Sequence, residues 1–452
     1  MSSRKGSGVV KRFFSAYGMI VALALLCVYY SVVTMQEQFP NGKEAAVSVA
    51  KQLSGSSFDN VIIVADNSAD GLSFVKDSKA MLEGKVKNII AVNGDPRSLK
   101  EALDNCKGQR LDAILASRQA ADWKLFASIS DKYPEFASAQ KLSPKSYRYP
   151  DFLKKANMMA IADRIVVIAI IAIGMTMVII TGGIDLSVGS FIALSAIISS
   201  YLIATFGGGV SASPMFVIFA FLVAIAISGM IGMFTGAMVT KFGVAPFIVT
   251  LAMMMVARGI GYIIAGGQSI YKLPDGITWL GRGTDLFGIP NTVVLMLVLY
   301  VIAHIVMTKT TFGRYVYAVG GNEEAARLSG VPTKLILFSV YIICSALAGL
   351  GGIIQTSQLK SGSPTYGNMY ELYVIAAVVV GGTSLSGGEG KIFGTLIGAL
   401  IIAVIQNGMN LTGVESYTQM VVLGLVILAA VLLDKIKRGN YLAKLVSIFS
   451  KS

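Results

Sequence analysis

The stretch AIADRIVVIAIIAIGMTMVIIT, residues 160–181, decides the fold class of this chain. Apart from Asp163 and Arg164 near its start, it carries no charged residue. A helix needs roughly 20 apolar residues to cross about 30 Å of hydrocarbon, because each residue adds about 1.5 Å. Of the 452 residues, 54% are hydrophobic and only 14% are charged. An average soluble domain has about 25% charged residues, so the composition excludes an ordinary soluble enzyme.

Similar apolar runs cover most of the chain. The first, at 13–35, follows Lys11 and Arg12, and its polar exit without a small-residue cleavage signal favours an uncleaved anchor over a secretory signal peptide. Nine more runs follow, and the first of them is the stretch quoted above. They lie at 160–181, 189–206, 214–239, 246–265, 290–308, 335–356, 372–382 with its flanks, 391–410 and 416–433. These runs predict an all-α polytopic membrane protein of about ten transmembrane helices.

Residues 41–155 differ in kind, because they hold 18 Lys/Arg and 14 Asp/Glu. Short β-rich runs begin at residues 61, 88 and 111 and alternate with helical patterns, a spacing typical of βαβ units with parallel strands. Asp95 followed by proline marks a helix start. We therefore expect a soluble α/β insert after the first helix. The predicted segments are a cytoplasmic N-terminus with the first helix (1–40), an extracytoplasmic insert (41–155), a membrane domain (156–434) and a basic cytoplasmic tail (435–452).

The net charge of +13 reflects topology rather than a nucleic-acid partner, because most of the excess lies beside apolar runs. With a cytoplasmic N-terminus, the short inner segments and tails collect fifteen Lys/Arg, whereas the short outer loops hold only Lys272, Arg282 and Lys360. This asymmetry satisfies the positive-inside rule, and long inserts translocate largely regardless of charge. We expect a multi-pass protein of the bacterial inner (plasma) membrane with both termini in the cytoplasm and the insert outside.

Motifs of covalent or nucleotide chemistry are absent. GGEGK at 387–391 lacks the spacing of a phosphate-binding loop, one histidine (His304) excludes HExxH, and no GxSxG occurs. Three cysteines share no short spacing, so neither a disulfide framework nor a metal site is expected, and His304 is expected to pack. The chain is predicted to be no enzyme and to hold no cofactor itself.

The segment GGNEEAARLSGVPTK, residues 320–334, predicts a helix of about seven residues. Asn322 can cap its start, Glu323 and Glu324 place negative charge at its positive N-terminus, and Gly330 ends it. A free helix this short is marginal in water. Capping at both ends suggests that the helix is held between the membrane domain and something else, while a plain surface connector stays open.

Two glycine-rich stretches share the pattern GGxxLSxG, namely GGIDLSVG at 182–189 and GGTSLSGG at 381–388. Each lies between apolar runs, so the echo marks either a duplication or a chance match among 48 glycines. Asp185 is a candidate functional group near the membrane, although it could simply cap the next helix, which we favour. Arg258 lies inside an apolar run and is expected to face the bundle interior or a wet cavity.

Several motifs together resemble a known family. These are GGIDLSVGS, APFIVTLAMMMVARG at 245–259, FGRYVYAVGGNEEAARLSGV at 312–331, GGTSLSGGEGKIFGTLIGALI at 381–401 and QNGMNLTGV at 406–414. In that order they resemble the ribose-type, monosaccharide permeases of ATP-binding-cassette (ABC) importers, within the branched-chain amino acid/ribose permease superfamily. The resemblance covers about 150–435 and the first span, and leaves the insert as an unusual addition.

The resemblance implies a partner for every step that this chain cannot perform. Such permeases work as a pair of membrane subunits, usually homodimeric, with a cytoplasmic ATPase that binds ATP and Mg²⁺ and a periplasmic sugar-binding protein. The implied coupling residues toward the ATPase are Asn322, Glu323, Glu324, Ala325, Ala326, Arg327 and Gly330. The implied candidates for the translocation path are Gly182, Gly183, Asp185, Ser187, Gly189, Arg258, Glu371, Gly381, Gly382, Ser384 and Ser386.

One departure from the family pattern concerns Tyr373, which stands where members usually have aspartate after Tyr-Glu-Leu; the role of that aspartate is absent or transferred to Glu371. The expected function is monosaccharide import, with a ribose-like pentose first and galactosides, xylose or arabinose as alternatives. An ion-coupled secondary transporter and a ligand sensor that uses the insert are the competing functions. For the insert itself, passive elaboration, docking of the sugar-binding protein and ligand binding stay open.

Overall fold

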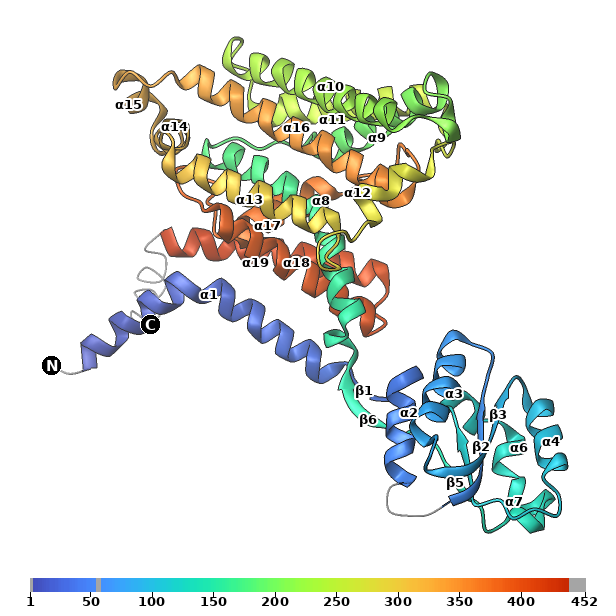
Figure 1. The fold of residues 1–452 in the computed structure, drawn as a ribbon. Helices are drawn as coiled ribbons and strands as arrows, with labels where there is room; N and C mark the ends of the chain where they lie inside the picture. The colour runs from blue at the N-terminus through green and yellow to red at the C-terminus, as the bar shows by residue number, and fades with distance from the viewer. Residues whose placement is uncertain (1–2, 54–57, 439–452) are drawn as a thin grey trace. The chain divides into compact units, whose positions relative to one another are not determined.

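The computed structural model describes residues 3–53 and 58–438, which form two compact units. The helical unit comprises Met1–Thr34 with Phe152–Ser452, and the insert unit comprises Met35–Asp151. The tail predicted at 435–452 lies outside the described residues from 439 onward. The helices of the helical unit (Figure 1) are α1 Ser3–Val33, α8 Lys155–Ile180, α9 Val188–Thr205, α10 Pro214–Thr240, α11 Pro246–Ala265, α12 Thr278–Arg282, α13 Asn291–Lys309, α14 Thr311–Gly321, α15 Glu323–Leu328, α16 Thr333–Leu359, α17 Tyr370–Val380, α18 Ile392–Leu411 and α19 Ser416–Arg438.

The polytopic α-helical fold predicted from the apolar runs is confirmed. Among the described residues, seven helices are long and apolar enough to cross a membrane: α8, α9, α10, α11, α13, α16 and α18. Three shorter apolar helical stretches lie at Gly18–Val33, Tyr370–Val380 and Ser416–Leu432. The count of ten transmembrane helices stays a prediction, because these three stretches have fewer residues than a straight crossing requires.

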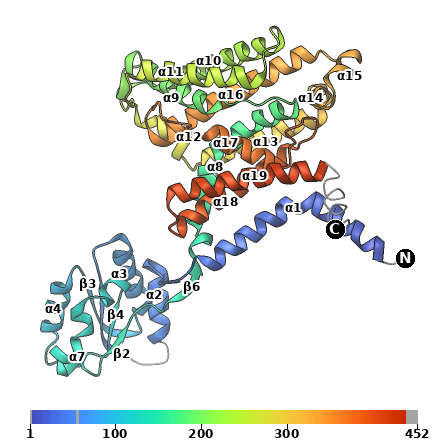
Figure 2. The same cartoon turned by 180° about the vertical axis from the view of Figure 1, so that it is seen from behind.

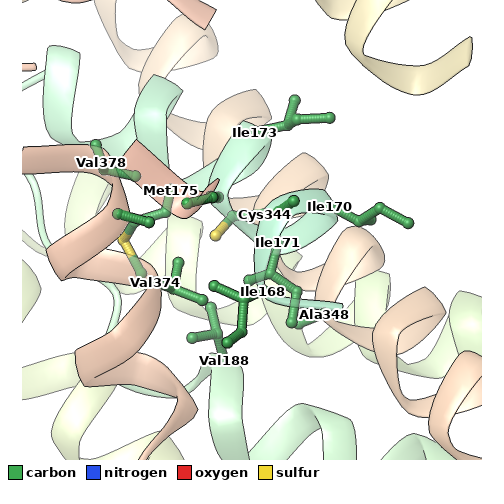
Figure 3. Packing of buried hydrophobic residues seen from close by; sticks show 14 of the residues in the cluster. Ile168, Ile170, Ile171, Ile173, Met175, Val188, Cys344, Ala348, Val374 and Val378 are labelled. Carbon is green, nitrogen blue, oxygen red and sulfur yellow. The ribbon is translucent and has the colours of Figure 1, made fainter. Parts of the chain in front are cut away.

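Helix α8 forms the centre of the helical unit. In its most apolar window 89% of the residues are buried, whereas the values for α10 and α11 are 28% and 22%. Figure 3 shows Ile171 and Met175 of α8 among side chains of α16 and α17, including Cys344 and Val374. A helix that is apolar all round is stable only where neighbours or lipid cover every face, so α8 takes the interior and α10 and α11 present apolar outer faces.

The insert unit is a parallel α/β layer, as the strand spacing predicts. Its four-stranded sheet has the order β3-β2-β4-β5, and all three pairings are parallel. Side chains of β2 alternate between the two faces, so that Ile62 and Ile63 enter separate buried clusters. The elements are α2 Gly42–Ala50, β2 Phe58–Ala65, α3 Ala69–Leu82, β3 Val86–Asn93, α4 Pro96–Asn105, β4 Ala113–Ala116, α5 Arg118–Ala121, α6 Lys124–Ala127, α7 Ile129–Lys132 and β5 Gln140–Leu142.

The insert unit contains one helix cap that the sequence predicts and one pair of strands that it does not. Asp95 caps α4 as predicted, because its carboxylate accepts hydrogen bonds from the backbone N–H groups of Arg97 and Ser98 at 2.9 and 3.0 Å. An antiparallel ribbon of β1 (Met35–Gln38) and β6 (Tyr147–Pro150) was not predicted. Its register pairs the first residues of the unit with its last, so the ribbon closes the unit where the chain enters and leaves.

The cysteines and the histidine have structural surroundings that differ from a disulfide or a metal site. All three cysteines are free, and within residues 3–53 and 58–438 no cluster of His, Cys, Asp or Glu could hold a metal ion. His304 is partly buried, with its ring 4.7 Å from the ring of Phe393. A packing role for His304 agrees with the expectation.

Candidate functional site

The short helix predicted at 320–334 is present as α15, at one end of the helical unit beside α14 (Figures 1 and 2). The side-chain oxygen of Asn322 accepts a hydrogen bond from the backbone N–H of Ala325 at 2.9 Å, which caps the helix. Gly330 has a φ of +83° and follows the last turn, as a helix-ending glycine does. The helix therefore begins and ends at the predicted residues.

The surface of α15 is charged on its exposed side and anchored by one small residue. Glu324 and Arg327 form an ion pair one turn apart, with about two thirds of each side chain exposed. Glu323 is exposed, whereas Ala326 is buried. An exposed ion pair contributes little to stability, so these charges are available to an outside partner.

Helix α14 connects α15 to the end of α8 and to a loop from a distant part of the sequence. We call residues 181–187 the first glycine loop and residues 381–391 the second glycine loop. The backbone N–H of Gly388 donates to the carbonyl of Ile180 at 2.8 Å, and the Tyr317 hydroxyl donates to the carbonyl of Gly390 at 2.8 Å. A methyl group on Gly320 would lie 1.7 Å from the same Ile180 oxygen, so α14 lies directly on the end of α8.

The two glycine loops begin with the same hydrogen-bond pattern, but not in the register of the sequence echo. Gly182 and Gly382 have φ values of +81° and +83°. Their backbone N–H groups, and those of the residues after them, bond to equivalent carbonyls of α8 and α17. In the shared GGxxLSxG pattern, however, Gly182 aligns with Gly381. The structural register is thus one residue away from the sequence register, which argues against a residue-by-residue duplication.

Asp185 does not cap α9 as we favoured from the sequence. The cap residue is Ser187, and Asp185 lies two residues before it and is fully buried. One carboxylate oxygen accepts hydrogen bonds from the backbone N–H (2.9 Å) and from the hydroxyl of Ser187. The other oxygen has no nitrogen or oxygen donor among the described residues, and the weakly donating thiol of Cys344 lies beside the carboxylate. The chain therefore keeps a buried acid whose hydrogen bonding is incomplete.

Three of the predicted path residues meet around Ser190. Arg258 is partly buried and donates from Nε to the Ser190 hydroxyl and from Nη1 to the carbonyl of Pro364, both at 3.3 Å. A methyl group on Gly189 would lie 2.2 Å from Oε2 of Glu371, so the missing side chain makes room for that carboxylate. Arg258 thus lies against α9, as expected for a charged residue within an apolar helix.

The remaining predicted residues lie elsewhere. Ser384 and Ser386 close the second glycine loop, where the Ser386 N–H donates to the Ser384 hydroxyl at 3.2 Å. Gly381 packs against the backbone of α18 at Gly394. The structure thus brings the glycine loops to the end that carries α14 and α15, and it places Gly189, Arg258 and Glu371 in a second group.

A cavity of about 580 Å³ opens beside α15. We call it the α15 cavity. Its lining consists of residues 181–183 of the first glycine loop, residues 239–246 from the end of α10 to the start of α11, Glu323 of α15, and Lys334, Leu337 and Tyr341 of α16. Sequence reasoning did not find it, because its walls come from four separate segments. The only local signal was a tyrosine within the apolar run of α16.

Comparison with known proteins gives the family. The pattern of the family described as branched-chain amino acid transport system / permease component matches residues 157–431, which include both glycine loops and α15. The chain belongs to this permease family. The family relationship agrees with the resemblance seen in the motifs, and it makes the chain a component of a transport system.

Curated members of the permease family cover the same region. The ribose import permease protein RbsC of Escherichia coli strain K12 is 44% identical over 293 residues, which are 64% of this chain and 88% of that protein. RbsC of Bacillus subtilis strain 168 is 46% identical over 290 residues, which are 64% of this chain and 87% of that protein. The D-allose permease AlsC of Escherichia coli strain K12 is 35% identical over 319 residues, 69% and 94% of the two chains. No solved structure matches the chain.

The family match begins after the insert unit. Met35–Asp151 lies outside residues 157–431, whereas helices α8 to α18 lie almost entirely within them. What the family implies therefore concerns the helical unit, and any role of the insert unit has to be argued separately.

Proposed function

We propose that this chain is the membrane-spanning subunit of an ABC importer that brings a monosaccharide into a bacterial cell. Relatives named as ribose, D-allose and L-arabinose permeases support a sugar as the substrate. A ribose-like pentose is the first candidate, with galactosides, xylose and arabinose as alternatives. A partner ATPase would bind ATP and Mg²⁺, and a second copy of this chain would complete the pore.

The observation that carries the proposal is the contact of α14 with the end of α8 and with the second glycine loop. An ATPase that moves α15 would move α14 with it, since Gly321 and Asn322 join the two helices without a loop. Gly320 would transfer the movement to the end of α8, and Tyr317 would transfer it to the second glycine loop. The exposed charges of Glu323, Glu324 and Arg327 would form the face that binds the ATPase.

The geometry of α8 supports the proposed topology. Its start follows Phe152, whose backbone N–H donates to the hydroxyl of Thr34 at 3.1 Å, where the chain returns from the insert. Its other end, Ile180, lies against Gly320. A helix of 26 residues spans roughly 39 Å, enough to cross a bilayer. With α15 in the cytoplasm, α8 would lead back to an insert unit outside, and we propose that both chain termini lie on the cytoplasmic side of the inner membrane.

The insert unit would then face the same compartment as a periplasmic sugar-binding protein. We propose docking of that protein as its testable role, with a passive role as the alternative. Ligand binding by the insert alone is less well supported, because a single lobe supplies only one side of a cleft.

Charge reversal on α15 tests the coupling claim. We expect Glu323→Lys with Glu324→Lys to abolish uptake and copurification of the ATPase while membrane insertion is unchanged. The matched control is Glu83→Lys with Glu101→Lys, which reverses two exposed charges in the insert unit. Retention of the ATPase by the α15 variant at the control's level would refute the assigned interface.

Vesicles containing the reconstituted complex test the substrate class. Uptake of a labelled panel of ribose, xylose, arabinose, galactose and allose is expected to require ATP inside the compartment that holds the ATPase. Concentrative uptake driven by an ion gradient without the ATPase would instead favour a secondary transporter.

A further inference from the structure

The α15 cavity has a polar interior with an unused hydrogen-bonding group. Tyr341 lines the cavity and is only 1% exposed, yet its hydroxyl has no hydrogen-bond partner among the described residues. A methyl group on Gly183 would lie 2.5 Å from that hydroxyl, so the lack of a side chain at Gly183 makes room for the hydroxyl. A buried hydroxyl without a partner carries a desolvation cost, which a ligand with a suitable polar atom removes.

The rim of the cavity carries two lysines. Lys241 comes from the segment between α10 and α11 and Lys334 from the first turn of α16; both are exposed, and neither has an ion-pair partner in the part of the chain that the structure describes. Glu323 is the one acidic side chain of the lining. Two cations and one anion favour a small ligand with a concentrated negative charge.

The cavity also has the size and the walls of a small-molecule site. Its volume of about 580 Å³ lies within the range of roughly 300–1,000 Å³ that is common for such sites. Besides Tyr341 and Glu323, the lining provides the hydroxyls of Thr181 and Thr240. The two threonine hydroxyls donate to the carbonyls of Val178 and Gly236, so that they, like the carboxylate, are left to accept hydrogen bonds from a ligand with several hydroxyl groups.

We propose that the α15 cavity binds a phosphorylated monosaccharide. The phosphate would lie between Lys241 and Lys334, since phosphate oxygens accept charge-assisted hydrogen bonds from ammonium groups. The sugar hydroxyls would reach inward to Tyr341 and to the first glycine loop. Unphosphorylated sugar would lack the group that the rim recognises, and inorganic phosphate would lack the groups that the interior recognises.

Such a ligand would link uptake to the next reaction of the imported sugar. A phosphorylated monosaccharide forms when a kinase-class reaction transfers a phosphoryl group to a sugar hydroxyl. By filling the cavity beside α15, the bound ligand would hinder movement of α15 and slow import when product accumulates. This regulatory consequence, unlike the binding itself, rests on the proposed function.

Binding to the purified full-length chain in lipid nanodiscs tests the site without the ATPase or transport. The probe is ribose 5-phosphate, with ribose and inorganic phosphate as comparison ligands in calorimetric titrations. We expect saturable binding of ribose 5-phosphate, at least tenfold tighter than either comparison ligand. Hydrogen exchange of residues 239–246 is expected to slow when it binds. Equal affinity for ribose or for inorganic phosphate would overturn the proposed two-part recognition.

Substitutions assign the binding to the cavity. Lys241→Gln with Lys334→Gln should weaken binding by about tenfold or more, and Tyr341→Phe by about fivefold, since charge-assisted hydrogen bonds are the stronger ones. Lys309→Gln with Lys391→Gln removes two exposed lysines outside the cavity lining and should change the affinity by less than twofold. No saturable binding, or equal weakening by both lysine pairs, would refute the site.

The transport readout then separates the two proposals. If ribose 5-phosphate binds in nanodiscs but does not slow ATP-driven uptake, the regulatory consequence is wrong and the site stands. If uptake does not depend on the ATPase, the proposed function fails while the binding result is unaffected.

Discussion

Substitution of Gly320 by alanine separates the contact of α14 with α8 from the helix itself. The added methyl group would lie 1.7 Å from the carbonyl oxygen of Ile180 and 2.7 Å from the backbone nitrogen of Gly388. The adjacent Gly321 provides a matched control, because a methyl group there would have no neighbour within 4 Å. Both are in the last turn of α14, so the two variants differ mainly in this contact.

The magnitude follows from the geometry. Real contacts of a Cβ atom are essentially never shorter than 3.0 Å, so α14 and the end of α8 must separate by about the difference between 3.0 and 1.7 Å. Overpacking of this kind costs about 1–3 kcal/mol. Loss of the hydrogen bond from Gly388 to Ile180 adds about 1 kcal/mol, and the better helix propensity of alanine returns about 0.5–1 kcal/mol. We expect Gly320→Ala to destabilise the protein by about 1–3 kcal/mol and Gly321→Ala to be neutral or slightly stabilising.

Thermal unfolding of the purified chain measures the loss of stability. ATP-driven uptake in vesicles measures whether movement still passes from α14 to α8. Because α15 is unchanged, Gly320→Ala should keep the ATPase bound but lose most of the uptake, with ATP hydrolysis no longer matched to transport. If Gly320→Ala and Gly321→Ala have the same melting temperature and the same uptake, the contact is not needed and the proposed route of movement is refuted.

Three further predictions concern other parts of the chain. Ser187→Ala should cost about 2 kcal/mol, because it removes a hydrogen bond to the buried carboxylate two residues earlier, whereas Ser386→Ala in the second glycine loop, which is exposed, should change the melting temperature little. Hydrogen bonds from the backbone N–H groups of Asn60 and Asp59, together with nearby Arg110, lower the pKa of Asp112. The carboxylate therefore stabilises the folded insert unit above the unfolded pKa near 3.8, and this stabilisation is lost as the pH falls through the lower folded pKa. Asp112→Asn should therefore speed hydrogen exchange in β2 at pH 7, and the difference from wild type should shrink below pH 3. Replacing residues 39–146 by Asn-Gly, which suits the register of the β1–β6 ribbon, should leave the melting temperature of the helical unit unchanged; a large decrease would show that the two units depend on each other.

The apolar spans could be predicted to within about three residues at most ends, because hydropathy is a local property that the bilayer enforces directly. The run at 160–181 corresponds to α8 at Lys155–Ile180, and the run at 335–356 to α16 at Thr333–Leu359. The first span begins earlier than expected, since α1 extends back to Ser3 through polar residues. Helices can continue beyond the hydrocarbon, where hydropathy no longer marks their ends.

The strands that were missed depend on distant partners. β5 has only three residues, and β1 has the polar sequence Met-Gln-Glu-Gln, which resembles the exit of a membrane helix. β1 is held by β6, more than 100 residues later. Strands of this kind carry little propensity of their own, because pairing and burial supply most of their stability.

In the candidate site, too, features set by neighbouring residues could be predicted from the sequence, and contacts between distant residues could not. The ends of α15 could be predicted, because Asn322 and Gly330 act on the nearest turn. The cap predicted at Asp185 was wrong: Ser187 occupies the cap position of α9, its side chain makes no capping hydrogen bond, and its N–H and hydroxyl donate to Asp185 instead. The contact between Gly320 and Ile180 joins residues 140 positions apart and has no local signal.

The one-residue offset between the glycine loops has a mechanical meaning of its own. Both loops leave their helices through a glycine with positive φ, at Gly182 and Gly382, so the helix ends are built alike. The loops then differ: the first continues to the buried Asp185, and the second turns back so that Gly388 bonds to Ile180. Since α14 contacts the end of α8 and the second loop together, one displacement of α14 acts on two unlike loops. We therefore expect the second loop to follow α14 through its hydrogen bonds, and the first loop to respond through the end of α8.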